Sequence, residues 1–192
     1  MSLPRIIRPT ERVLLDQIIS DVQEVLATEL TFLDHVFGKV QVATQNKLKR
    51  KQTYPAAFYQ TESRDRYLDL TPSKEYGNYC FFVVDDDQEV ETVNRLLYRI
   101  KTDCSIIFWF DLSTLGASTD RRLEYIKNLI LDTLTTSLYT PSGKFSVSRV
   151  HERAANIFKE FSILETDSQY LMQPYAGLRF DGELIWENRN NC

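Results

Sequence analysis

The sequence predicts an α+β protein: an antiparallel β-sheet with two to three helices packed on one face. Two observations lead to this prediction. Apolar residues recur at helical spacing near the start of the chain and again in its second half. Strand-like runs cluster between these helices, which is typical of α+β rather than α/β proteins. The 192 residues suit a single domain, which we expect over residues 10–192, after an extended N-terminal arm over residues 1–9.

Three segments have the pattern of helices. Residues 10–28 begin with Thr10, a good N-cap residue, and carry large apolar residues at intervals of three and four. Thr119 can cap a second helix that has leucines and isoleucines along one side. The stretch "SRVHERAANIFKEF", residues 148–161, predicts a shorter third helix.

Other segments have the pattern of strands: residues 39–44, 54–59, 65–70, 79–84, 104–110 and 177–187. The run "YCFFVV" does not alternate, so it suits a strand that is covered on both faces, and "CSIIFWF" is the strongest strand pattern of the chain. The last strand alternates and places Arg179 and Asp181 on a charged face, so part of the sheet is expected to meet water. Residues 90–102 fit a helix and a strand equally well.

Charge and cysteine content narrow the class of protein. The net charge of −4 gives no general attraction to nucleic acid or to anionic lipid. No apolar run approaches 18 residues, so we expect no membrane partner. Three cysteines without C-x-x-C spacing disfavour a disulfide framework and favour a reducing compartment. Cys80 and Cys104 lie in apolar strands, where we expect them to be inert.

The aspartates that follow two apolar runs allow two interpretations. Asp85 and Asp87 come after "FFVV", and Asp111 comes after "IIFWF". Carboxylates at strand ends can hold Mg²⁺ or Mn²⁺, which would suit a nuclease. Aspartate is also a common turn residue, and adjacent residues of an extended chain point to opposite sides. We favour the turn, and therefore expect no metal ligand and no cofactor.

Catalytic motifs are not recognisable. His35 and His151 have no partner at metal-ligand spacing, and the chain has no G-x-S-x-G motif. "PSGK" lacks the upstream glycine of a phosphate-binding loop, because position 138 is leucine. We therefore predict no catalytic residue and a protein that is not an enzyme.

A basic patch interrupts the acidic chain. Four of the five residues in "KLKRK" are basic: Lys47, Lys49, Arg50 and Lys51. Such a cluster can contact phosphates, but no recognition motif accompanies it. We favour a solvated loop or a contact with an acidic neighbouring subunit over nucleic acid.

The strands carry more large apolar side chains than a partly wet sheet needs. A neighbouring subunit could cover this surplus, since homo-oligomer interfaces resemble a core cut in half. The residues predicted for such an interface are Ile6, Ile7, Phe81, Phe82, Phe108, Trp109 and Trp186.

The order of elements resembles that of phage tail terminator and head–tail joining proteins. Four pieces carry the resemblance: "ERVLLDQIISDVQEVL", "TDCSIIFWFDLSTL", "DRRLEYIKNLILDTL" and "QPYAGLRFDGELIWENRNNC". The resemblance implies a virion structural protein that forms a ring, commonly a hexamer, on the tail tube and joins tail to head. Its partners would be tail-tube and head-completion proteins, first in the bacterial cytoplasm and then in the virion. The alternative is a metal-dependent nuclease or nucleic-acid-binding protein of a mobile element that uses Asp85, Asp87 and Asp111.

Overall fold

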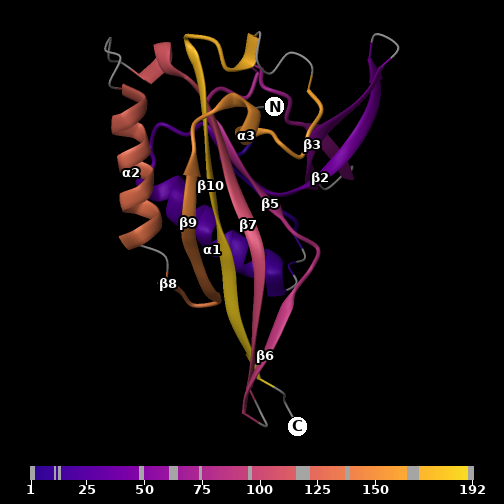
Figure 1. The fold of residues 1–192 in the computed structure, drawn as a ribbon, viewed down its shortest axis with the longest axis vertical. Coiled ribbons are helices and arrows are strands. Elements are labelled where there is room, and N and C mark those ends of the chain that lie inside the picture. The colour runs from indigo at the N-terminus through magenta and orange to yellow at the C-terminus, as the bar shows by residue number, and fades with distance from the viewer. Residues whose placement is uncertain are drawn as a thin grey trace.

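The computed structural model describes residues 3–10, 12, 14–47, 50–60, 65–73, 75–94, 97–115, 122–136, 139–163 and 169–189. Within these ranges the chain is mostly β, with one mixed sheet of ten strands and three α-helices (Figure 1). The predicted α+β fold, an antiparallel sheet with helices on one face, is therefore wrong. The sheet is larger than expected, and two of its strand pairs are parallel.

The strands are β1 (Ile6–Ile7), β2 (His35–Lys47), β3 (Arg50–Gln60), β4 (Asp65–Asp69), β5 (Tyr79–Val84), β6 (Glu89–Asn94), β7 (Leu97–Asp111), β8 (Tyr139–Thr140), β9 (Gly143–His151) and β10 (Tyr175–Arg189). Their order is β4-β3-β2-β5-β7-β10-β9-β8, with β1 beside β2 and β6 beside β7. The long strands β7 and β10 pair over all 15 residues and form the centre of the sheet.

The helices are α1 (Leu14–Glu29), α2 (Arg122–Thr136) and α3 (Ala154–Ile157), with a 3-10 turn, η1, at Leu112–Leu115. The first two agree with the helical patterns of the sequence, except that α1 begins at Leu14 and not at Thr10; Thr119, the predicted cap of the second helix, lies outside the described residues. The predicted helix over 148–161 is largely wrong, because β9 continues to His151 and only four residues form α3. Pairing with β10 has overridden the local helical pattern there.

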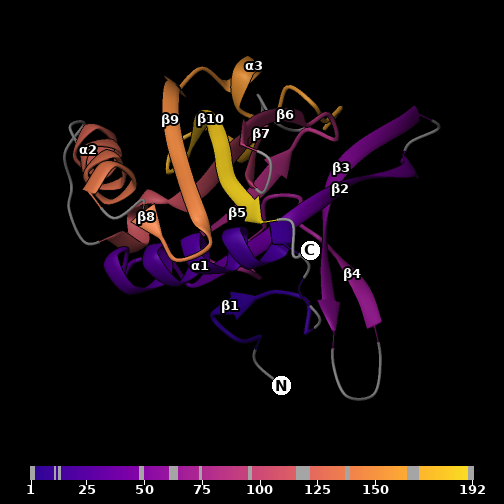
Figure 2. The ribbon, with the colours of Figure 1, turned by 90° about the horizontal axis from the view of Figure 1, so that it is seen from below.

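The core has two layers, one on each face of the sheet, because α1 and α3 lie on opposite sides of it (Figure 2). On one face α1 and α2 pack on Phe82, Phe108 and Phe180. On the other face, Tyr79, Phe81 and Trp109 are covered by α3, the residues after it, and strands β1 to β4. The apolar runs in β5 and β7 therefore contribute to both layers, and for β5 this confirms the prediction of a strand that is covered on both faces.

Two further segments belong to this sheet: residues 90–102, for which the sequence allowed a helix or a strand, and part of the predicted N-terminal arm. Residues 90–102 form the β6–β7 hairpin, so the strand interpretation is correct. The first residues are extended, as expected for an arm, but Ile6 and Ile7 pair with Val36 and Phe37 as strand β1. Ile7 is 1% exposed, so this stretch packs on the body of its own chain.

One glycine before β5 holds a conformation that other residues rarely adopt. Gly77 has φ of 60°, and an added Cβ would lie 2.2 Å from Oδ2 of Asp34. That oxygen accepts a hydrogen bond from the Asn78 amide at 2.7 Å, so it cannot move without losing the bond. We expect Gly77→Ala to lower the free energy of unfolding by about 1–3 kcal/mol, as measured by urea denaturation.

Gly38 provides the matched control for this substitution. An added Cβ there would meet the Ile7 carbonyl oxygen at 3.5 Å and the Gln23 side chain at 3.8 Å, which are ordinary contacts. Gly38→Ala should therefore change stability by less than about 1 kcal/mol. Equal losses in the two variants would contradict the assigned strain at Gly77.

Candidate interaction surfaces and polar sites

The aspartates of the alternative metal site lie far apart. Asp85 pairs through its amide with the carbonyl of Asp103, which is eight residues along β7 from Asp111. At ~3.3 Å per residue this separates Asp85 from Asp111 by roughly 26 Å. A single ion with ligands at about 2–2.6 Å cannot bind both. No group of three or more histidine, cysteine or acidic side chains suited to a metal ion occurs among the described residues.

The side chains of Asp85 and Asp111 instead stabilise turns. Oδ1 of Asp111 accepts hydrogen bonds from the amide and hydroxyl of Ser113 and starts η1. Oδ1 of Asp85 accepts the amide of Asp87 at 3.2 Å after β5 ends. The turn interpretation of the sequence therefore describes their contacts correctly.

Most side chains that the sequence assigned to a subunit interface lie inside the chain. Ile7, Phe81, Phe82, Phe108, Trp109 and Trp186 are between 0% and 4% exposed. Ile6 is partly buried against the layer under α1. The surplus of apolar side chains has an internal explanation, because the second layer of the core covers it. Surfaces for a partner must therefore be sought among exposed residues.

The basic patch lies at the end of a hairpin that projects from the body (Figure 1). Lys47 ends β2 and pairs in register with Arg50 at the start of β3, while Lys51 lies opposite Asn46 and is exposed. Lys49 lies outside the described residues. Of the predicted loop, residues 45–47 and 50–52 thus lie in two paired strands, and we call these described residues the β2–β3 tip.

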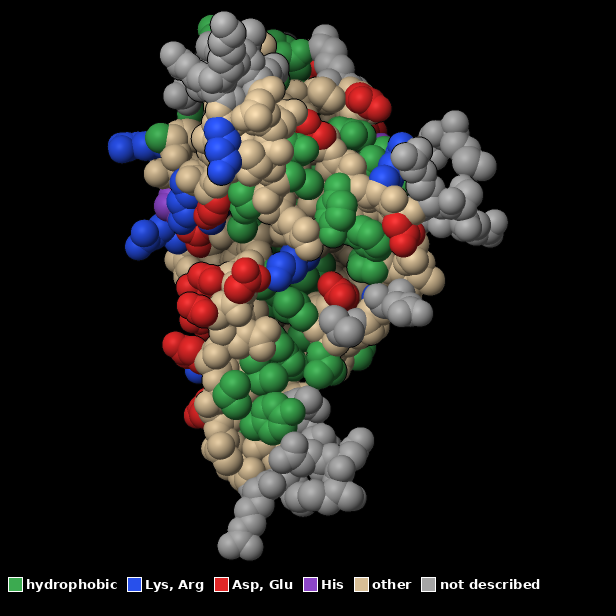
Figure 3. All heavy atoms as spheres, turned by 90° about the vertical axis from the view of Figure 1, so that its right-hand side faces the viewer, with side chains coloured by type: hydrophobic (Ala, Val, Ile, Leu, Met, Phe, Trp, Pro, Cys, Tyr) green, Lys and Arg blue, Asp and Glu red, His purple; other side chains and the backbone are tan. Residues whose placement is uncertain are grey.

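A second projection forms the narrow end of the molecule (Figure 1). Its described part consists of residues 85–94 and 97–103, which contain β6 and the first part of β7, together with residues 183–189 of β10; we call it the arm. Exposed carboxylates are concentrated on it: Asp85, Asp86, Asp87, Glu89, Glu91, Asp103, Glu183 and Glu187. Figure 3 shows acidic side chains along one edge of the molecule, with hydrophobic ones beside them toward the narrow end.

The two faces of the arm differ in character. On one face Arg99 contacts Glu187 at 2.9 Å and Glu91 at 3.7 Å. On the other face Val90 lies opposite Ile100, which in turn lies opposite Trp186. Ile100 and Trp186 are buried, but Val90 is 64% exposed. The apolar row of the core therefore continues onto the surface of the arm.

A buried polar network joins α3 to the sheet, and sequence reasoning missed it. Arg179 is 2% exposed; its guanidinium donates to both carboxylate oxygens of Glu160, to Oδ1 of Asp181 and to the hydroxyl of Ser105. His151 contacts the other Asp181 oxygen at 3.0 Å. The charged face of β10, which was expected to meet water, is thus covered at Arg179. No local signal pointed to it, because Ser105 and Glu160 lie 74 and 19 residues away from Arg179 in the sequence.

The electrostatics of Asp181 follow from these contacts. Partial burial by itself would raise its pKa, but hydrogen bonds from Ser105, Arg179 and His151 and the charge of Arg179 outweigh burial. They hold the pKa of Asp181 well below its usual range. Its ionised form is therefore the one that the fold stabilises.

This shift predicts a dependence of stability on pH. Because the folded pKa of Asp181 is lowered, its contribution is present above the unfolded pKa of about 3.9 and is lost as pH falls through the folded pKa. We expect Asp181→Asn to be less stable than wild type at neutral pH, with the difference shrinking below about pH 4. Urea denaturation across this range measures it; a difference that stays constant with pH would contradict the assignment.

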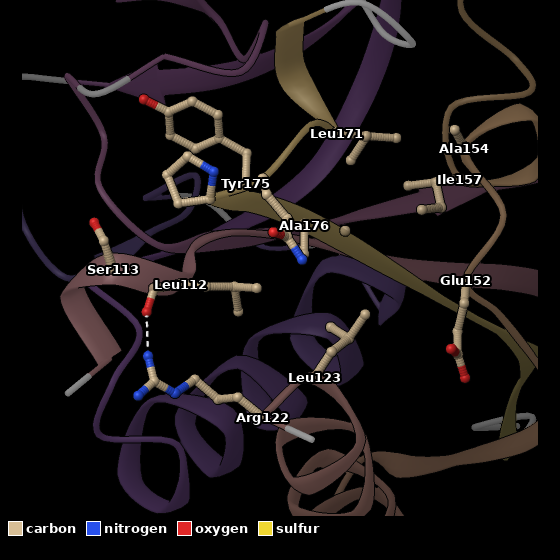
Figure 4. Close-up of a pocket in the computed structure, with 13 residues that line it drawn as sticks. Leu112, Ser113, Arg122, Leu123, Glu152, Ala154, Ile157, Leu171, Tyr175 and Ala176 are labelled. Carbon is tan, nitrogen blue, oxygen red and sulfur yellow. Dashed lines mark hydrogen bonds between the residues drawn. The ribbon is translucent and has the colours of Figure 1, made fainter. Parts of the chain in front are cut away.

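A pocket of about 700 Å³ lies where α2 begins beside the start of β10 (Figure 4). Leu123, Ile157 and Leu171 give it an apolar wall, and Glu152 stands at one side. Arg122 donates from Nη1 to the carbonyl of Leu112, whereas its Nε and Nη2 are buried without a hydrogen-bond partner. The pocket is mostly apolar with one incompletely satisfied cation.

The remaining residues that the sequence singled out have contacts or burial that support the fold. Nδ1 of His35 lies 2.9 Å from the carbonyl of Pro4 and fastens the N-terminal stretch. Burial raises the pKa of the Cys80 and Cys104 thiols, which makes the reactive thiolate scarce. None of the described helices is long and apolar enough to cross a membrane.

No protein-family model matches the chain, and no curated protein gives a significant match to it.

Proposed function

We propose that the chain is an assembly protein of a phage or prophage particle, similar to tail terminators, that forms a ring on the tail tube and joins it to the head. It would act by contact and not by catalysis, in the bacterial cytoplasm during assembly and afterwards in the virion. Its partners would be further copies of itself, a tail-tube protein and a head-completion protein.

One observation carries this proposal: the four stretches that resemble tail terminators form a contiguous unit. Two of them supply most of β7 and all of β10, which pair over their whole length. The other two supply α1 and α2, which pack against the same face of these strands. A resemblance spread along the sequence thus becomes one unit of the fold, which favours a shared architecture over a chance match of patterns.

The exposed surface is compatible with assembly. Two projections, the β2–β3 tip and the arm, leave the body at different ends (Figure 1). A ring needs two different surfaces on each copy, because each copy contacts one neighbour on either side. The nuclease alternative receives no such support, since Asp85 and Asp87 lie far from Asp111.

Light scattering over a concentration series, with electron microscopy of the largest species, tests the proposal. We expect a defined multi-subunit species that appears as rings and that binds the tail-tube protein encoded in the same genome. A strict monomer at every concentration that also fails to bind that protein would overturn the proposal.

A further inference from the structure

Strand β6 leaves one side of its backbone without a neighbouring strand. It lies toward the narrow end of the molecule (Figure 1), and it pairs with β7 alone among the strands that the structure describes. All six of its residues are exposed. Over residues 89–93, the N–H and C=O groups that face away from β7 therefore have no strand partner in the described part of the chain. Proteins protect such edges or use them to bind a partner.

The sequence of β6 does not protect this edge in the usual way. It contains neither proline nor lysine, the residues that most often block an exposed edge. Its valines, Val90 and Val93, are 64% and 44% exposed, and β-branched residues favour strand pairing. Glu89 and Glu91 are its only charged residues. They would repel an acidic strand and attract a basic one, so they make the edge selective without closing it.

One face of β6 is strongly acidic. Glu89 and Glu91 lie on this face, opposite Lys101 and Arg99 of β7. A hollow of about 260 Å³ beside them contains Lys101 as the one cation among its described lining residues. Five carboxylates line this hollow: Asp85, Asp87, Glu89, Asp103 and Glu183. None of these five forms an ion pair with another described residue, so their charge is available to a basic partner.

The opposite face of β6 is apolar at its centre. Val90 lies opposite Ile100, and Ile100 lies opposite Trp186 on the next strand. Ile100 and Trp186 are 8% and 4% exposed, so the apolar row of the core ends at the exposed Val90. A further strand beside β6 that carried an apolar residue next to Val90 would continue this row and cover the valine.

A second copy of the chain does not supply the strand that this edge requires. Pairing β6 with β6 of another copy would place glutamates beside glutamates, which is unfavourable. The described edge strand at the far end of the sheet, β4, has Asp65 and Asp69 on one face, and these are also acidic. The charge of the edge therefore favours an occupant from a different protein.

We propose that β6 binds an extended segment of a different protein in which basic residues alternate with apolar ones. The segment would add to the sheet as a strand through main-chain hydrogen bonds. Its basic side chains would lie on the face of Glu89 and Glu91, and its apolar side chains would lie beside Val90 on the other face. The inference goes beyond the proposed function, because it gives the chemistry of a partner and does not require that copies form a ring.

Two peptides of equal composition test this inference. In one, lysine and valine alternate; in the other, the same lysines and valines form two blocks. Both peptides have the same charge, so general attraction to an acidic surface would bind them equally. We expect the alternating peptide to bind at least about tenfold more tightly, as measured by fluorescence anisotropy. We also expect that it alone slows amide hydrogen exchange in β6, as measured by NMR.

Substitutions on the two faces show whether the peptide binds as a strand. Glu89→Lys should weaken binding of the alternating peptide about tenfold, and Glu89→Gln about threefold. Glu29→Lys, at an exposed position of α1, makes the same change in net charge and should bind like wild type. On the other face, Val90→Ser should weaken binding about threefold. A peptide that lay on one face only would respond to one of these positions and not to both.

The outcomes that would overturn the inference are specific. Equal affinity for the two peptides would show charge attraction without strand addition. No binding of the alternating peptide at about 1 mM, or binding that Glu89→Lys leaves unchanged, would also overturn it. If Glu89→Lys does not fold, as judged by circular dichroism, Glu89→Gln and Val90→Ser decide the question. A chain that never forms rings would contradict the proposed function and leave the peptide result unaffected.

Discussion

Replacing Arg179 with alanine is expected to lower the free energy of unfolding by about 3–5 kcal/mol, among the largest effects of any single change in this chain. The guanidinium is 2% exposed and satisfies Glu160, Asp181 and Ser105 at once. Removing it leaves two carboxylates next to each other without their cation, in a site where water cannot fully replace it. Urea denaturation at neutral pH measures the loss.

Comparisons within the network show whether the loss comes from the charge. Lys159 contacts Asp181 at 3.4 Å but is exposed, so Lys159→Ala should cost less than about 1 kcal/mol. Glu160→Ala removes one of the stranded carboxylates, so the double variant with Arg179→Ala should lose less than the sum of the single losses. Additive losses, or an Arg179→Ala variant within about 1 kcal/mol of wild type, would contradict a coupled buried network.

The local spacing of apolar residues correctly predicted the helices and strands whose formation is determined within the segment itself. Helix α1 follows from its spacing of apolar residues, and β5 and β7 follow from their apolar runs. The stretch 148–161 was mistaken for a helix because its apolar spacing fits one, whereas its pairing with β10 is set by residues about 30 positions later. Pairing of that kind leaves no local signal, which is why the fold class was predicted with too few strands.

The same distinction between local and long-range determinants applies to the candidate surfaces. The basic tip was visible as a charge run, although its position at the end of two strands was not. The network of Arg179 was invisible because Ser105 lies 74 residues before it and Glu160 lies 19 residues before it. The apolar residues assigned to an interface were correctly seen as a surplus for a one-layer sheet. The sequence did not reveal that β1 to β4 and α3 build a second layer over them.

Trp109→Ala tests that second layer directly. The side chain is 1% exposed, its ring stacks on Tyr175 with centroids 5.1 Å apart, and its Nε1 donates to the carbonyl of Tyr170 at 2.7 Å. Truncation leaves a cavity near the C-terminal end of β7 and removes this hydrogen bond. We expect a loss of about 3–5 kcal/mol in the free energy of unfolding. Trp109→Phe keeps most of the ring and should lose about 1–2 kcal/mol.

The same substitution decides whether Trp109 belongs to the core or to a subunit interface. A core residue affects the unfolding of the single chain, so the loss should be the same in samples that are dilute enough to contain only monomers. An interface residue would leave dilute unfolding unchanged and would weaken only assembly. The exposed Tyr139, at 87% exposure, gives the control, and Tyr139→Ala should shift stability by no more than about 0.5 kcal/mol. If the Trp109→Ala chain unfolds like wild type in dilute samples, Trp109 belongs to a subunit interface, and the second core layer is contradicted.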